Sequence, residues 1–116
     1  MYYFSAMDQA KYIKGLLEPI VLKLLHEEGR MYGYEITQKI RQQTAGELTI
    51  TEGALYPLLH RLEADGIIEA EQELAGNRLR KYYRLTRKGK KQSNTAMESL
   101  RDFSQMLALL LQPQKS

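Results

Sequence analysis

The residues of this sequence best suited to chemistry form a run of cations in its second half. Residues 77–91 contain eight Lys or Arg and no Asp or Glu, whereas residues 1–76 contain seven basic and twelve acidic side chains. The 116-residue chain therefore carries its formal charge of +3 unevenly. Guanidinium and ammonium groups interleaved with tyrosines favour contact with a polyanion, the alternative being a solvated surface.

Catalytic chemistry has little support among the other residue types. The chain has no cysteine, which excludes disulfides and thiolate nucleophiles. His26 and His60 fall in different predicted helices, and two ligands do not make a zinc site. The glycines lack the strand that precedes a phosphate-binding loop, and no serine stands in a nucleophile-elbow context. We therefore expect a protein that is not an enzyme and needs no metal or cofactor.

Two amphipathic helices are predicted in the first part of the chain. Residues 13–28 repeat apolar side chains with a period near 3.6, and Gly29 ends this helix. Residues 32–43 place apolar side chains at i, i+4 and i+8, which predicts that Tyr32 lies in the core. Residues 44–47 then form a turn.

The third predicted helix, from about residue 51 to residue 65, has one apolar and one polar face. Its apolar face consists of Leu55, Leu58, Leu59 and Leu62. Thr51 is expected to cap its amino end, with Thr49 as a competing cap. Pro57 predicts either a kink or a regular helix that begins near Tyr56. The residues expected to face outward are Thr51, Gly53, Tyr56, Pro57, His60 and Arg61.

A β-hairpin and a long helix are predicted after Gly66. Residues 67–74 and 79–85 read as strands, and we expect one of Tyr82 and Tyr83 to be buried because they point to opposite faces. The last helix runs from Thr86 to about residue 111. It carries a heptad-like seam that consists of Ala96, Leu100, Phe103, Leu107 and Leu110. The seam predicts a homodimer, and the alternative is that it packs on its own domain.

The order helix, helix, turn, helix, hairpin predicts a winged helix-turn-helix fold of the mainly α (α+β) class. We expect residues 1–86 to form the DNA-binding domain and residues 87–116 to form the dimerisation helix and a short tail. The third helix would enter the major groove of double-stranded DNA, which is wide enough for a helix. The hairpin would reach across the DNA backbone.

Three ordered motifs between about residues 14 and 90 carry a family resemblance. They are Tyr32-Gly33-Tyr34-Glu35-Ile36, the segment GALYPLLHRLE over residues 53–63, and the segment RKYYRLT over residues 80–86 followed by Gly89. The sequence thereby resembles the PadR family of bacterial transcriptional regulators, in the short subfamily whose single C-terminal helix builds the dimer. The resemblance implies repression through a pseudo-palindromic operator, released by a small-molecule or stress signal. The chain departs from the family pattern at Glu52, where proline is common, and at Ala54, where threonine is.

The resemblance and the pattern together name the residues expected to contact DNA. They are Tyr34 and Lys39 in the second helix, Thr51, Gly53, Tyr56, Pro57, His60 and Arg61 in the third, and Asn77, Arg78, Arg80 and Lys81 in the hairpin. A small-molecule effector is expected at the dimer interface, between the last helix and the first, in a pocket lined by Met7, Ile13, Met97, Leu100 and Phe103. The alternative is a protein without an effector.

The main alternative function is a winged-helix module that contacts another protein instead of DNA. RNA binding has less support because nothing resembles a platform on which unpaired bases stack. The longest apolar run, residues 106–111, is too short to cross a membrane, and the start of the sequence lacks the pattern of a secretory signal. We expect a cytoplasmic protein that does not contact membranes.

Overall fold

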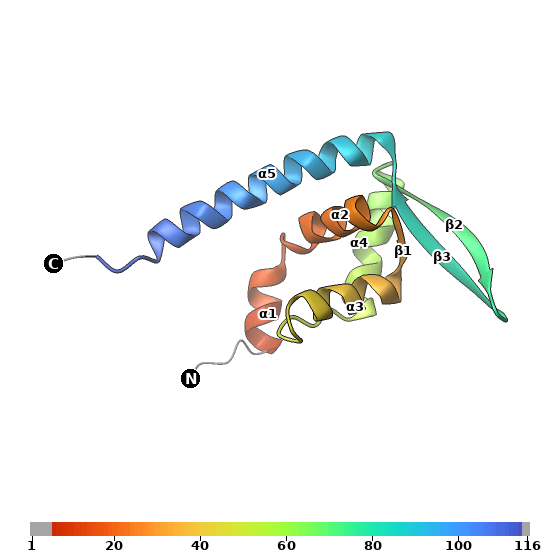
Figure 1. Ribbon diagram of the computed structural model, residues 1–116, viewed down its shortest axis with the longest axis horizontal. Coiled ribbons are helices and arrows are strands. Elements are labelled where there is room, and N and C mark those ends of the chain that lie inside the picture. The colour runs from red at the N-terminus through yellow and green to blue at the C-terminus, as the bar shows by residue number, and fades with distance from the viewer. Residues whose placement is uncertain (1–5, 115–116) are drawn as a thin grey trace.

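The computed structural model describes residues 6–114, and the side chains of residues 9–114. The described elements are α1 (Ala6–Ile13), α2 (Leu17–Glu28), β1 (Arg30–Tyr32), α3 (Gly33–Gln43), α4 (Glu52–Ala64), β2 (Ile68–Ala75), β3 (Arg78–Leu85) and α5 (Arg87–Leu110). In Figure 1 the β2–β3 hairpin and the C-terminal half of α5 project from a body that α2, α3 and α4 form. This arrangement confirms the predicted winged helix with a long C-terminal helix.

The first part of the chain differs from the sequence prediction in two places. The helix expected over residues 13–28 begins only at Leu17, because a turn with Gly15 at φ 89° separates it from the unpredicted α1. Gly29, at φ 86°, ends α2 as expected. The three-residue strand β1 then leads directly into α3, and it is too short to show a period in the sequence.

Helix α4 has well-defined ends. The hydroxyl oxygen of Thr51 accepts a hydrogen bond from the Ala54 amide at 3.1 Å, so Thr51 and not Thr49 is the cap. Gly66, at φ 73°, allows the Ile67 amide to donate to the Leu62 carbonyl at 2.9 Å, which closes the last turn. Helix α4 continues past Pro57 from Glu52 to Ala64, so of the two alternatives given for Pro57, the one in which the regular helix begins near Tyr56 is wrong.

The sheet is antiparallel, with β3 between β1 and β2. Ala75 pairs with Arg78, which leaves a two-residue turn whose first residue, Gly76, has a φ of 64°. Tyr83 is buried with 1% of its surface exposed, whereas its neighbour Tyr82 is half-buried on the opposite face. The prediction that one of the two tyrosines belongs to the core is therefore confirmed.

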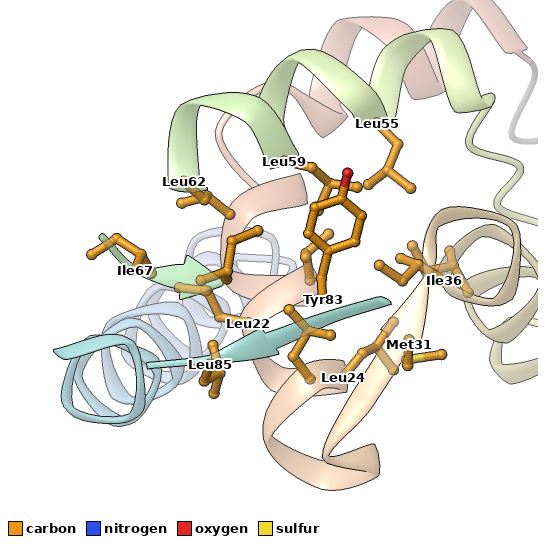
Figure 2. Close-up of a cluster of buried hydrophobic side chains, with 14 of the residues drawn as sticks. Leu22, Leu24, Met31, Ile36, Leu55, Leu59, Leu62, Ile67, Tyr83 and Leu85 are labelled. Atoms are coloured by element: carbon orange, nitrogen blue, oxygen red, sulfur yellow. The ribbon is translucent and has the colours of Figure 1, made fainter. Parts of the chain in front are cut away.

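The core lies between α4, α2 and the inner face of the sheet. Figure 2 shows Leu55, Leu59 and Leu62 extending from α4 toward the sheet, with the ring of Tyr83 beneath the helix. These three leucines are fully buried, but Leu58, which was expected beside them, is only half-buried. The expectation that Tyr32 is a core residue is also wrong. The preceding residue in β1, Met31, points inward, so strand alternation turns Tyr32 outward.

The beginning of α5 is held against the body. A Cβ added at Gly89 would lie 1.9 Å from the Ile67 carbonyl oxygen, so this position requires glycine. One turn later the buried Ser93 hydroxyl donates to the Leu22 carbonyl at 3.3 Å. From Arg101 to Gln114 every described residue is exposed. None of the helices within the described residues is long and apolar enough to span a membrane.

Candidate nucleic-acid interface

An open groove of about 600 Å³ lies between the start of α3, helix α4 and strand β3. Its lining consists of Tyr32, Gly33, Tyr34, Glu52, Tyr56, His60, Arg78, Leu79, Arg80, Lys81 and Tyr83. Six of the predicted DNA contacts are among these residues, and they come from three separate elements. The fold therefore brings residues that are up to 47 positions apart, Tyr34 and Lys81, to one concave surface.

The floor of the groove depends on close approach between α3 and α4. A Cβ at Gly33 would lie 2.7 Å from the hydroxyl oxygen of Tyr56, so Gly33 makes room for this ring. Tyr56 is consequently half-buried and does not point freely outward as expected. Burial raises the pKa of Tyr56 above its ordinary value of 10.0, and the nearby carboxylate of Glu52 raises it further. The phenol therefore gives up its proton less readily than a solvated tyrosine and retains its hydrogen-bond donor.

The outer edge of α4 presents most of the other predicted contacts. Thr51, Gly53, Pro57 and His60 are exposed along this edge. The His60 ring lies 6.3 Å from the Tyr56 ring, which places it at the rim of the groove. Because the leucines on the opposite face fix the rotation of α4, this polar edge has a defined direction.

Three of the predicted cations already have carboxylate partners within the chain. Arg61 pairs with Glu18 of α2 at 2.6 Å, Lys39 with Glu28 at 3.1 Å, and Lys81 with Glu63 of α4 at 3.2 Å. The sequence analysis did not predict these three ion pairs. These pairs are exposed, and such pairs contribute only about 0–1 kcal/mol. The hydrogen bond to Glu63 raises the pKa of Lys81, which keeps the ammonium charged. DNA phosphates could therefore replace these carboxylates at small cost.

A tyrosine–guanidinium ladder, formed by Arg30, Tyr82, Tyr32 and Arg80, crosses the outer face of the sheet. The Arg30 guanidinium lies 4.2 Å from the centre of the Tyr82 ring, the two tyrosine rings meet edge-on at 5.4 Å, and the Arg80 guanidinium lies 4.6 Å from the Tyr32 ring. Glu71 and Glu73 of β2 hold Arg30 at 2.9 and 2.6 Å. The ladder thus connects the hairpin to the residue that precedes α3.

Sequence reasoning missed the ladder although part of its signal is present. Arg30 and Tyr32 are separated by one residue, as are Arg80 and Tyr82, which is the spacing of side chains on one face of a strand. The pairing of Tyr32 with Tyr82 across β1 and β3 depends on recognising the short first strand. At the tip of the hairpin Asn77 and Arg78 are exposed, and Arg78 makes no ion pair with any described residue.

The predicted dimer seam is partly covered and partly open. Ala96 and Leu100 are half-buried, whereas the exposed fractions of Phe103, Leu107 and Leu110 are 47%, 41% and 70%. The alternative that the whole seam packs on its own domain is therefore wrong within one chain, because the domain covers only the first part of the seam. Met106, Leu109 and Leu111 add to the exposed apolar surface at this end of α5.

The predicted effector contacts whose side chains are described do not all line one hollow of the chain. Leu100 and Phe103 line a hollow of about 290 Å³ between α5 and the junction of α1 with α2. Ile13 lines a different hollow, beside Tyr12 and Leu48, and Met97 lines neither. The side chain of Met7 lies outside the described residues. Within one chain Ile13 therefore lies beside the α3–α4 loop, on a different surface from Leu100 and Phe103, and the pocket expected at the dimer interface stays a prediction.

The fold and the groove define a winged-helix protein whose polar recognition edge and basic hairpin share one surface. Residues 21–95 match the sequence model of the family described as transcriptional regulator PadR-like. The chain is 34% identical over 107 residues to protein X of Lysinibacillus sphaericus, covering 91% of this chain and 97% of that protein. This chain belongs to the PadR-like family of transcriptional regulators, which supports the expectation that it is not an enzyme.

Solved structures agree with this assignment. A PadR-like transcriptional regulator from Bacillus cereus is 31% identical and superposes with a TM-score of 0.76, over 90% of this chain and 99% of that one. The crystal structure of Bacillus subtilis PadR in complex with operator DNA shares the fold at a TM-score of 0.62 and 24% identity. That match covers 87% of this chain and 49% of the Bacillus subtilis chain.

Proposed function

We propose that this protein binds duplex DNA as a homodimer and represses transcription from a pseudo-palindromic site. The observation that carries the proposal is the shared surface of α4 and the hairpin, where a polar helix edge meets three cations of β3. Such a surface matches the shape and charge of a DNA groove and its flanking phosphates. Bacillus subtilis PadR, which has the same fold, has been solved with operator DNA.

Helix α4 is the proposed major-groove element. Its amino end is free of packing near Gly53, where an added Cβ would meet only the Thr51 hydroxyl oxygen at 3.9 Å. The positive end of the helix dipole favours a phosphate at this position, although Glu52 opposes it. Gly53, Pro57 and His60 would then face base edges, while Arg61 would exchange Glu18 for the DNA.

The exposed end of α5 supports dimerisation. Phe103, Leu107 and Leu110 recur with heptad-like spacing on a helix that extends beyond its own domain. Burying them requires a partner surface, and a second copy of the same helix supplies one under two-fold symmetry. A two-fold dimer would present two α4 helices to half-sites about 34–36 Å apart.

A small-molecule signal is a further part of the proposal. The hollow beside Leu100 and Phe103 opens on the same side as the proposed dimer seam, so an occupant would favour one dimer geometry over another. Thermal-shift measurements with a panel of phenolic acids and cationic aromatic drugs test this part. Stabilisation by a panel member that also weakens DNA binding supports it, and no stabilisation by any member contradicts it.

Titration onto random-sequence duplex DNA at rising salt tests DNA binding itself. We expect measurable binding at about 50 mM salt and a log–log slope of several units, because each neutralised phosphate releases counterions. Sequencing the fragments that the protein retains from a random pool should then reveal a site with two symmetric halves. A flat salt dependence, or no binding at low salt, would favour the protein–protein module instead.

A further inference from the structure

The tip of the β2–β3 hairpin carries two large apolar side chains that the body of the protein does not cover. Leu74 and Leu79 lie directly opposite each other across the two strands, and 69% and 65% of their surfaces are exposed. Single exposed leucines are common on protein surfaces, but this pair forms one continuous apolar patch. Nothing in the fold of the described chain accounts for the patch.

Strand alternation gives the patch a direction. Leu79 is on the same face of β3 as Tyr83 and Leu85, which are buried in the core. The pair therefore faces the side of the sheet on which α4 packs, and Leu79 lines the groove between α4 and the hairpin. Figure 1 shows the hairpin projecting beyond the helices, so its tip extends away from the body of the protein.

The charges around the patch indicate the chemistry of the partner that it fits. Residues 74–81 contain Arg78, Arg80 and Lys81 and no acidic side chain. A second hairpin placed against this one would bring like charges together, whereas a polyanion with apolar walls would satisfy both features. The minor groove of DNA has such walls, and minor-groove proteins combine arginines with apolar residues such as leucine.

We propose that Leu74 and Leu79 enter the minor groove of duplex DNA as an apolar contact, with Arg78 beside them. The proposal rests on the proposed DNA-binding function, in which α4 occupies the major groove and the projecting hairpin meets the adjacent groove. The leucines contribute a part of the affinity that does not depend on salt. The two leucines also favour base pairs that lack an amino group in the minor groove, because the guanine N2 amino group projects into the groove and makes it shallower.

Duplexes of alternating inosine–cytosine and guanine–cytosine separate this contact from the rest of the interface. Inosine presents the same major-groove atoms as guanine and lacks only the minor-groove amino group. We expect the wild-type protein to bind the inosine duplex about fivefold more tightly. The Leu74→Thr/Leu79→Thr variant should bind it about tenfold more weakly than wild type, lose the preference and keep the salt slope. Arg78→Gln, the matched control, should lower the salt slope by about one.

The outcomes separate this inference from the proposed function. A wild-type protein that binds neither duplex, or binds without salt dependence, contradicts DNA binding as a whole. Salt-dependent binding with no inosine preference, or with a preference that the double variant retains, overturns the leucine contact alone. Equal weakening of the variant on both duplexes shows contact with the backbone and overturns the minor-groove assignment. Since both leucines are exposed, thermal unfolding should be unchanged, and Leu79→Thr alone provides a milder second variant.

Discussion

Helices α4 and α5 are both amphipathic, but their apolar faces have different surroundings. The leucines of α4 at positions 55, 59 and 62 are fully covered by the domain, so only its polar edge reaches the surface. In α5 the covered part ends near Leu100, and Phe103, Leu107 and Leu110 remain exposed. The comparison teaches that α4 is covered by its own domain, whereas the described residues leave the end of α5 uncovered, which is why we propose a second copy as its partner.

The covered face of α4 gives the largest expected effect. Leu59→Ala should lower the free energy of unfolding by about 2–5 kcal/mol, because it removes a buried side chain from a packed core. Chemical denaturation measures the change. Leu74→Ala, at an exposed position, should stay within about 0.5 kcal/mol of wild type. Equal losses in the two variants would show that α4 is not packed as described.

The open face of α5 should govern assembly instead of folding. Leu107→Lys would place a charge from each copy in the proposed two-fold interface, so analytical ultracentrifugation should find monomers. DNA affinity should fall about a hundredfold, because the two half-sites are no longer bound together. Gln105→Lys adds the same charge on another side of α5 and should leave the dimer intact. A dimeric Leu107→Lys protein would show that the seam is not the interface.

The tyrosine–guanidinium ladder links the hairpin to the residue that precedes α3, so a substitution in it tests whether this contact positions the hairpin. Tyr82→Leu removes the ring that Arg30 and Tyr32 contact and should weaken binding to random duplex DNA two- to fivefold, an effect of about 0.5–1 kcal/mol. Tyr82→Phe keeps the ring and should bind like wild type. If the two variants weaken binding equally, the hydroxyl group matters and the ladder does not position the hairpin.

The ion pair between Arg61 and Glu18 gives the smallest expected effect. If Arg61 leaves Glu18 to contact DNA, Glu18→Gln removes the competitor and should tighten binding about twofold with a steeper salt dependence. Arg61→Ala should weaken binding and alter base preference, whereas Lys81→Ala should weaken all sequences alike. Unchanged binding in both Glu18→Gln and Arg61→Ala would remove Arg61 from the proposed interface.

Features that repeat locally could be predicted from the sequence. The leucine spacing of residues 55–62, the hairpin around Gly76 and the long helix after Thr86 each depend on side chains a few positions apart. The apolar spacing of each segment matches the face that is buried in the structure, because the burial of one face determines whether the segment forms a helix or a strand. The predicted hairpin bounds shifted by one residue, and the predicted third helix by one residue at each end.

Features that depend on distant residues could not be predicted. The partner of Arg61 lies 43 positions away in α2, and β1 is too short to show alternation. The position of Ile13 is another example, because helical spacing does not reveal that a turn at Gly15 separates it from the surface beside Phe103. Which residues contact DNA, and whether the chain dimerises, remain predictions.

Methylation protection with dimethyl sulfate tests the central claim most directly, because the reagent modifies guanine N7 in the major groove. The probe is a duplex that the protein itself selects from a random pool. We predict two clusters of protected guanines, with centres about one helical turn (10–10.5 base pairs) apart, one for each copy of α4. Tight binding without protection of guanine N7, or with a single protected cluster, would contradict the account.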